Sequence, residues 1–259
     1  MVAELMLQQT QVARVVDRWH RFLDRFPTPA ACAVAPAGDV IDEWAGLGYN
    51  RRALYLHRMA GVITDEHGGR FPAHRKALLA LPGVGPYTAR AIRVFAFERP
   101  DAVVDTNVAR ILARTGGGRL KPKAAQAAAD AALDRPGRDP WAWNQALLDV
   151  GAGWCTARSP RCDSCPLRLH CRWHAEGNPK PDPATGSAGV SGRQSRFEGS
   201  DRQGRGRLID ALRAGPVNRA DLAAVMGWPD DPDRAERVAE SVVADGLAVI
   251  TDGRYRLPS

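Results

Sequence analysis

The chain has 259 residues, which is enough for one large domain or for two to three smaller ones. Lys and Arg outnumber Asp and Glu by 36 to 29, and the isoelectric point of about 9.5 favours a polyanionic partner without indicating a fold. No apolar run is long enough to span a membrane and residues 1–4 do not open a signal peptide, so we expect a soluble cytoplasmic protein. These features exclude a membrane-embedded or secreted protein as the first hypothesis.

The first part of the chain has helical patterning throughout. Residues 3–26 carry apolar side chains at helical spacing up to Pro27, which predicts one helix. Similar spacing, interrupted by Pro and Gly, predicts further helices over residues 30–35, 38–44, 51–67, 75–80, 107–114, 124–133 and 141–150. Strand signals are almost absent before residue 175, so this part is predicted to be all-α.

A tight turn is predicted within residues 81–89. Gly83 and Gly85 flank Val84, so the backbone can turn sharply and leave the valine as a plug. Pro86 suits the first position of a new helix, and a helix N-terminus behind a glycine turn can bind phosphate. An ordinary connection between two helices is the alternative for a lone Gly-Val-Gly.

Four of the five cysteines, Cys155, Cys162, Cys165 and Cys171, are separated by six, two and five residues. In an intracellular protein such crowding indicates a metal site rather than disulfide bonds. Four thiolates this close can hold one iron–sulfur cluster, whereas structural zinc usually uses two close pairs joined by a longer loop. Cys32 stands apart on an apolar helix and is predicted to be a core residue.

The composition changes over residues 177–206 to Pro, Gly, Ser, Asp and Arg, which predicts a flexible linker. Beyond it, helices are predicted over residues 207–213, 219–226 and 232–245, followed by a hairpin around Asp252-Gly253. Three helices and a closing hairpin indicate a winged-helix-like module over residues 207–259. The linker arginines Arg193, Arg196, Arg202 and Arg205 favour added non-specific DNA affinity, and a capping or protein-binding role is the equal alternative.

The hairpin, Asp105 and the cysteine spacing together resemble the helix–hairpin–helix DNA glycosylase superfamily. The cysteine spacing matches the [4Fe–4S] loop of endonuclease III and MutY-type glycosylases, and Glu4–Val12 resembles the catalytic motif of MutY-type adenine DNA glycosylases. The resemblance implies an all-α, two-lobed fold with a cluster loop. We therefore expect a helical domain with the hairpin and catalytic residues (1–114), a cluster domain (115–176), the linker (177–206) and the module (207–259).

Breaking an N-glycosidic bond requires a proton for the departing base and charge stabilisation for the sugar. Glu4 lies among apolar residues that can keep a carboxyl protonated, and Asp105 precedes a helix where it can stay ionised. The structural alternatives are a solvated acid in the first helical turn for Glu4 and a helix N-cap for Asp105. In the family that the chain resembles, the glutamate protonates adenine and the aspartate acts on the flipped nucleotide.

The resemblance also implies DNA-binding roles. It implies that the partner base and the gap in the duplex are contacted by Gln8, Gln9 and Thr10. It also implies a wedge beside that base formed by Leu47 and Tyr49, which could equally be core residues. It implies that adenine is bound by Gln145, and that the reacting sugar and water are held by Asn107. It implies a hairpin that grips a phosphate at Gly83 and Gly85. It also implies a contact between the DNA backbone and the loop that carries Arg158 and Arg161. Tyr87 replaces the lysine of endonuclease III, and no lysine occurs between Lys76 and Lys121, which indicates a monofunctional enzyme that uses water.

The chain departs from the family in three respects. It begins almost at the catalytic helix, so we expect the family's preceding segment, which supplies part of the adenine pocket, to be missing. Asn50 and Thr106 look more like endonuclease III, and residues 207–259 are too short for the usual Nudix-like domain.

The resulting hypothesis is a nucleoid-associated bacterial monomer that removes adenine opposite 8-oxoguanine or guanine from double-stranded DNA. The alternatives are another glycosylase of this superfamily, acting on a mismatched thymine or an oxidised pyrimidine, and a catalytically weak DNA-binding damage sensor.

Overall fold

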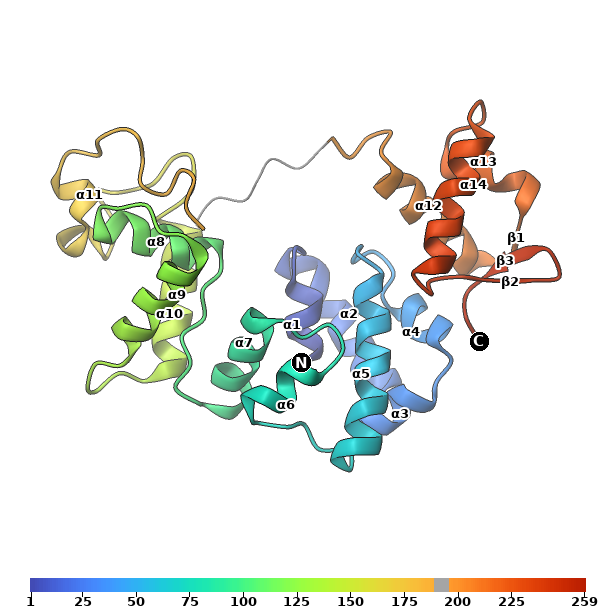
Figure 1. Cartoon of the computed structure of the whole chain (residues 1–259), viewed down its shortest axis with the longest axis horizontal. Coiled ribbons are helices and arrows are strands. Elements are labelled where there is room, and N and C mark those ends of the chain that lie inside the picture. Colours follow the sequence, from blue (N-terminus) through green and yellow to red (C-terminus); the bar gives the residue numbers. More distant parts are fainter. Residues whose placement is uncertain (189–195) are drawn as a thin grey trace. The chain divides into compact units, whose positions relative to one another are not determined.

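The computed structural model describes residues 1–188 and 196–259, which are mainly helical (Figure 1). The helices of the first range are α1 (Val2–Leu7), α2 (Val12–Arg25), α3 (Pro29–Val34), α4 (Ala37–Glu43), α5 (Arg51–His67), α6 (Arg75–Ala80), α7 (Pro86–Phe97), α8 (Thr106–Gly116), α9 (Pro122–Leu133), α10 (Pro140–Gly153) and α11 (Arg172–Ala175). The second range contains α12 (Asp201–Ala214), β1 (Val217–Asn218), α13 (Leu222–Met226), α14 (Pro232–Ala244), β2 (Val249–Thr251) and β3 (Arg254–Arg256). Among these described helices, none is long and apolar enough to cross a membrane.

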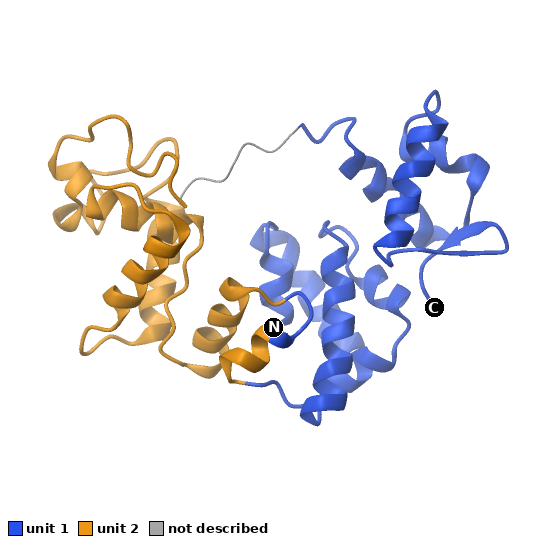
Figure 2. Ribbon diagram, in the orientation of Figure 1, with its two compact units in different colours: residues 1–72, 80–83, 194–259 blue, residues 73–79, 84–193 orange. Residues whose placement is uncertain are grey.

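The chain divides into two compact units (Figure 2). Unit 1 comprises Met1–Pro72, Ala80–Gly83 and Gln194–Ser259, and unit 2 comprises Ala73–Leu79 and Val84–Arg193. This division differs from the predicted boundary after residue 114. The reason is that α8 packs against α9, α10 and α11, so the helix that follows Asp105 belongs with the cysteine loop rather than with the first helices.

Helix α5 lies in the core of unit 1, where α1, α3 and α4 pack against it. Trp44 is fully buried and meets the ring of Phe22 edge-on, with 6.4 Å between the ring centroids. Cys32 is 4% exposed, and burial raises the pKa of its thiol to about 12. The prediction that Cys32 is a core residue is confirmed.

The predicted helix over residues 3–26 is wrong in one respect, because it is two helices, α1 and α2. The chain leaves the helical conformation after Leu7, and Gln9 has a left-handed backbone with φ of 58°. Gln11 then begins α2 in an extended conformation. The break matters because it separates the Glu4 helix from the long amphipathic helix that follows it.

The C-terminal region has the predicted order of three helices and a hairpin. Strands β2 and β3 pair in antiparallel fashion around Asp252 and Gly253, both left-handed, and β1 adds to β3, giving the order β1-β3-β2. Helix α12 begins at Asp201, six residues earlier than predicted. Ser200 caps it by accepting a hydrogen bond from the backbone N–H of Gln203, and Gly204 faces the ring of Trp228.

The predicted linker over residues 177–206 is therefore shorter in the structure at its C-terminal end. It is also shorter at its N-terminal end, where Ala184 and Ser187 are buried. Residues 189–195, which include Arg193, lie outside the described residues. This segment contains few large apolar residues, and for that reason the sequence predicted a flexible linker. In the structure, backbone hydrogen bonds and an ion pair hold the segment in place instead.

Candidate active site and iron–sulfur centre

Glu4 lies in the first turn of α1 and is half-buried. Its neighbours Leu5 and Met6 are 1% and 0% exposed. Burial raises the pKa of the Glu4 carboxyl above its usual value, and a hydrogen bond from Gln8 and the nearby terminal amine partly oppose this shift. A carboxyl in this setting can hold its proton closer to neutral pH than an ordinary glutamate.

Arg52 fixes the end of the Glu4 helix. Its Nη1 donates to the carbonyl oxygens of Leu5 (2.6 Å), Met6 (3.1 Å) and Gln8 (2.5 Å). In a continuous helix those oxygens would accept from backbone N–H groups one turn later. The buried guanidinium takes the place of those donors, which explains why α1 ends where it does.

The same guanidinium holds the loop that carries Tyr49. Its Nη2 donates to the carbonyl oxygens of Leu47 (3.0 Å) and Gly48 (2.9 Å) and to the hydroxyl of Thr10 (3.1 Å). Thr10 in turn donates to Leu47, and its side chain thus joins the two segments a second time. The loop between α4 and α5 and the segment after α1 therefore form one hydrogen-bonded assembly around Arg52.

Within this assembly the two predicted wedge residues differ. Leu47 is 5% exposed, as the core alternative expects, whereas Tyr49 is 47% exposed and has a left-handed backbone with φ of 48°. Gln9 is exposed and also left-handed. Non-glycine residues in this conformation are strained and concentrate at functional sites.

Sequence reasoning missed Arg52. It is 8% exposed, lies 5.3 Å from the ring of Trp44 and 5.6 Å from that of Tyr49, and burial lowers its pKa to about 10 although Tyr49 opposes the shift. Its sequence position, next to another arginine at the start of a helix, carries no local signal of burial. The arginine is still charged at neutral pH and so remains a donor.

The predicted hairpin forms between α6 and α7. Gly83 has φ of 75°, and a Cβ there would lie 2.6 Å from the Cβ of Tyr55, so both the backbone and the space require glycine. Val84 is buried, as predicted for a plug, and Pro86 is the first residue of α7 after Gly85. The prediction of a turn that opens a new helix is confirmed.

In unit 2, Asp105 is the N-cap of α8, as the structural alternative expects. Its carboxylate accepts from the backbone N–H of Val108 (2.7 Å) and from the amide of Asn107 (3.0 Å). Arg110 donates to the amide oxygen of Asn107 (2.6 Å) and to the carbonyl oxygens of Gly151 (2.9 Å) and Cys155 (2.5 Å). The Asp105 carboxylate is thus linked through two side chains to the first cysteine of the loop.

Two further predicted residues lie in unit 2. Tyr87 is half-buried and packs against the core cluster that contains Val103, two residues before Asp105. Gln145 donates to Asp149 on the next turn of α10 (2.9 Å), and none of the hydrogen bonds of the described residues joins it to Asp105. Its neighbour Asn144, which is 1% exposed, holds the backbone of Val103 (2.7 Å) and so positions the extended segment before Asp105.

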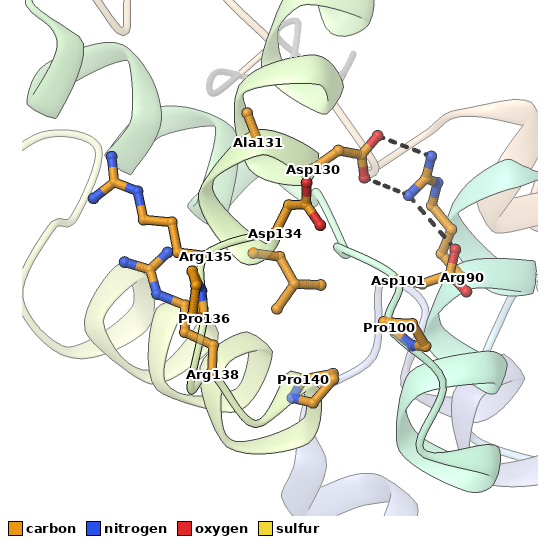
Figure 3. A pocket seen from close by; sticks show the side chains of 11 residues that line it. Arg90, Pro100, Asp101, Asp130, Ala131, Asp134, Arg135, Pro136, Arg138 and Pro140 are labelled. Atoms are coloured by element: carbon orange, nitrogen blue, oxygen red, sulfur yellow. Dashed lines mark hydrogen bonds and ion pairs between the residues drawn. The ribbon is translucent and has the colours of Figure 1, made fainter.

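The same segment forms one wall of a cavity of about 570 Å³ (Figure 3). Arg90 makes a two-pronged ion pair with Asp130 (2.7 and 3.1 Å) and donates to the carbonyl oxygen of Ala102 (3.3 Å). The residues that line this cavity include none of the predicted site residues. Arg90 is paired there with Asp130 and lies close to Asp101, and its hydrogen bond to Ala102 helps to hold the backbone of this segment.

The four cysteines of the loop line one small cavity. Burial and the charges of Cys171 and Cys155 raise the pKa of the Cys162 thiol, and burial likewise raises that of Cys171. Four adjacent thiolates therefore require a cationic group between them, which an iron–sulfur cluster provides. Among the described residues, no three His, Cys, Asp or Glu side chains form a site for a single metal ion.

The loop between Cys155 and Cys162 exposes two arginines that differ in their surroundings. Arg161 donates to the carbonyl oxygen of Gly153 and stacks on Trp154, with 5.9 Å from its guanidinium to the ring centroid. Arg158 is exposed. Arg161 therefore shapes the loop, whereas Arg158 extends from it.

Comparison with known families defines the class of this protein. The family model described as HhH-GPD superfamily base excision DNA repair protein matches residues 2–133, and the iron–sulfur binding domain of endonuclease III matches residues 155–171. The second match covers all four cysteines and confirms the predicted cluster site. The fold, the hairpin and the cysteine loop thus define a helix–hairpin–helix base excision repair protein.

Two relatives align with almost the whole length of this chain. Adenine DNA glycosylase of Mycolicibacterium smegmatis is 43% identical over 262 residues, which cover 99% of this chain and 86% of the relative. Its counterpart in Mycobacterium tuberculosis is 43% identical over 265 residues, which cover 100% and 84%. The chain belongs to the adenine DNA glycosylases of this superfamily, which hydrolyse N-glycosidic bonds.

Solved structures agree with this fold. A thermostable thymine-DNA glycosylase has a TM-score of 0.63 and 30% identity, covering 68% of this chain and 82% of that one. Endonuclease III in a non-covalent DNA complex has a TM-score of 0.60 and 26% identity, covering 68% and 83%. The all-α glycosylase fold predicted from the sequence is confirmed.

Proposed function

We propose that the protein binds double-stranded DNA and removes adenine paired with 8-oxoguanine or guanine, by hydrolysis and without cleaving the strand. The observation that carries this proposal is the Glu4 carboxyl, whose pKa is raised by burial beside Leu5 and Met6. A departing adenine needs a proton, and a carboxyl that keeps its proton near neutral pH can donate it. The resulting carboxylate can then assist the attacking water.

Asp105 is the second carboxyl in this mechanism. An oxocarbenium-like sugar carries positive charge, and a fixed carboxylate stabilises it. The N–H of Val108 and the amide of Asn107 fix the Asp105 carboxylate, and Arg110 fixes that amide in turn. We assign the reacting sugar and water to Asn107. Tyr87 stands where a lysine would form a Schiff base, so water is the nucleophile.

The remaining residues are assigned to the duplex. The α7 N-terminus behind Gly83 and Gly85 would bind a phosphate, because its backbone N–H groups and the helix dipole favour an anion. We assign a further phosphate to the loop that carries Arg158 and Arg161.

A base pulled out of a duplex leaves a gap that a flat side chain can fill. The exposed ring of Tyr49 suits this role, with Leu47 anchoring the loop beneath it. Gln8, Gln9 and Thr10, which share the Arg52 assembly, would contact the partner base. Gln145 is assigned to adenine, since an amide can donate and accept along one base edge.

The cluster supplies a rigid centre for the loop between Cys155 and Cys171, and its ligands are the four cysteines. The location that fits this activity is the bacterial nucleoid in the cytoplasm, and we expect the enzyme to act as a monomer.

The test is excision on duplexes that contain A opposite 8-oxoguanine, G or C, and T opposite G, scored before and after alkali. The proposal expects strand breaks only after alkali, and only for the first two adenine pairs. Release of thymine would favour the thymine mismatch alternative. Binding of every duplex without base release would favour a damage sensor.

A further inference from the structure

We propose that residues 179–188 form a strap beside the cluster site, and that Asp182 is a positioning residue which holds Arg114 against the sulfur of Cys155. The strap follows the last cysteine and lies outside the iron–sulfur domain match, which ends at residue 171. Its role is to determine how firmly the protein retains its cluster.

The strap is anchored at both ends. At the start, the indole N–H of Trp173 donates to the carbonyl oxygen of Pro179 (2.8 Å). At the end, the N–H of Ala188 donates to the carbonyl oxygen of Leu120 (2.9 Å), just beyond α8. Between these points Ala184 is 1% and Ser187 8% exposed. The strap therefore has a defined position on unit 2.

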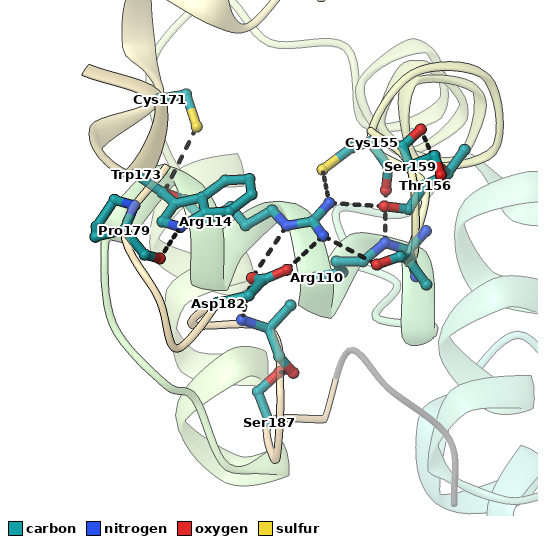
Figure 4. Close-up of polar contacts among 12 residues, drawn as sticks. Arg110, Arg114, Cys155, Thr156, Ser159, Cys171, Trp173, Pro179, Asp182 and Ser187 are labelled. Atoms are coloured by element: carbon teal, nitrogen blue, oxygen red, sulfur yellow. Dashed lines mark hydrogen bonds and ion pairs between the residues drawn. The ribbon is translucent and has the colours of Figure 1, made fainter. Parts of the chain in front are cut away.

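Asp182 binds Arg114 through both carboxylate oxygens (Figure 4). The Nε of Arg114 lies 3.2 Å from one oxygen and its Nη2 lies 2.6 Å from the other. Arg114 is 1% exposed, and its guanidinium lies 4.8 Å from the ring centroid of Trp173. This two-pronged contact fixes the plane of the guanidinium, which a single hydrogen bond would not do.

The remaining N–H groups of Arg114 point to the first part of the cluster loop. Nη1 donates to the sulfur of Cys155 (3.3 Å) and to the carbonyl oxygen of Thr156 (2.8 Å), and Nη2 also donates to that of Ala157 (3.3 Å). A cationic donor stabilises the negative charge of a thiolate ligand, and such partners orient metal ligands. The strap thus acts on Cys155 through Arg114.

The buried positive charge of Arg114 requires the Asp182 carboxylate as its partner. A buried guanidinium without a carboxylate is strongly unfavourable, and Arg114 would then turn toward water. Burial by itself would raise the pKa of Asp182, but hydrogen bonds from Arg114 and from the N–H of Ala184 keep it below its usual value. The pair is therefore ionised at neutral pH, and loss of either charge releases the hold on Cys155.

The experiment compares Asp182→Ala and Asp182→Asn with Asp163→Asn in the full-length protein that carries its cluster. Asp163 is exposed within the cluster loop and offers the same change of charge. The readouts are the rate at which visible cluster absorbance disappears in the presence of an iron chelator, and the iron content after dialysis. Both are measured far below the unfolding temperature, with circular dichroism to follow the helices.

We expect about tenfold faster cluster loss for Asp182→Ala, a smaller effect for Asp182→Asn, and the wild-type rate for Asp163→Asn. A merely structural role would lower the unfolding temperature without changing cluster loss in the folded state. Wild-type rates in both Asp182 variants would overturn the proposal. So would failure of both variants to fold, since the strap would then support the whole unit rather than the cluster.

Discussion

Arg52 donates a hydrogen bond of 2.5 Å to the carbonyl oxygen of Gln8, which lies 44 residues earlier in the chain. The same guanidinium donates to the carbonyl oxygen of Gly48 (2.9 Å). Each of these oxygens immediately precedes a left-handed, non-glycine residue, Gln9 in one segment and Tyr49 in the other. Each strained residue costs about 1–3 kcal/mol, so one buried cation stabilises two unfavourable conformations at the same site.

Arg52→Lys should therefore lower both stability and activity. Lysine keeps the charge but lacks the planar fork, so it cannot reach the carbonyl oxygens of both segments at once. We expect the free energy of unfolding to fall by about 3 kcal/mol and excision to slow, as both segments relax. Denaturant unfolding and single-turnover excision measure these effects. Arg14→Lys, at an exposed position of α2, is the control and should behave as wild type; equal behaviour of both variants would refute this role for Arg52.

Glu4→Gln should abolish adenine release while leaving duplex binding nearly unchanged, because the amide keeps the shape and loses the acid. The variant also has a stability signature. The folded-state pKa of Glu4 is raised, so the stability that its neutral form contributes is present at low pH and lost as pH rises through that pKa. Glu4→Gln should therefore be more stable than wild type at neutral pH and equal to it in acid. Urea unfolding across pH tests this, with exposed Glu66→Gln as the control.

Local patterns predicted several features correctly. The Gly83 turn, the proline at the start of α7, the N-cap role of Asp105 and the cysteine loop each depend on residues a few positions apart. Turn chemistry and capping act over that range, and a sequence can express them directly.

What the sequence could not predict depends on contacts between distant segments. The break after α1 exists because Arg52 reaches back to Gln8, and the segment predicted as a linker is fixed by Asp182, which binds Arg114 across 68 positions. Neither arginine differs in its local pattern from the many exposed arginines of this basic chain. Their burial follows only from the tertiary fold.

Asp105 should separate stability from catalysis. Asparagine is as good an N-cap as aspartate, so Asp105→Asn should keep the cap of α8 at Val108 while losing excision, because the charge and the oxygen that accepts from Asn107 are gone. Asp105→Ala should lose excision and, in addition, about 1 kcal/mol of stability. Thermal unfolding together with single-turnover excision distinguishes the two variants. Substantial excision by Asp105→Asn would remove this residue from the mechanism.

The two loop arginines should separate DNA contact from loop structure. Arg158→Ala should weaken binding to all duplexes, because one phosphate contact is lost. The slope of the logarithm of the binding constant against the logarithm of salt concentration should become shallower by about one. Arg161→Ala should also loosen the loop, since Arg161 donates to Gly153 and stacks on Trp154. Salt titrations of binding, with iron content as the second readout, test this. An unchanged salt dependence in Arg158→Ala would place the phosphate contact elsewhere.

The C-terminal region differs in charge from the rest of the chain. Residues 196–259 contain ten arginines against eleven Asp and Glu, so this region is not basic although the chain is. Several of its arginines are engaged: Arg205 pairs with Asp245, and Arg219 pairs with Glu236. Of the two roles that the sequence left open, these observations favour capping over non-specific DNA binding.

The C-terminal region covers part of the helical region at Arg213, whose side chain is 11% exposed. Arg213 donates to the carbonyl oxygen of Ile41 (2.9 Å) and to the side-chain oxygen of Asn50 (3.2 Å). Asn50 directly follows Tyr49 in the chain. Because this contact shields most of the Arg213 side chain from solvent, Arg213→Ala should slow excision about fivefold through the Tyr49 loop without changing the salt dependence of binding. Arg254→Ala, which removes an exposed charge from the hairpin, should change neither. Asn50→Ala should reproduce the Arg213 effect, and the double variant should be no worse than either single one, since both remove the same contact. Weaker, less salt-dependent binding in Arg254→Ala, with normal excision by Arg213→Ala, would instead show that this region binds DNA.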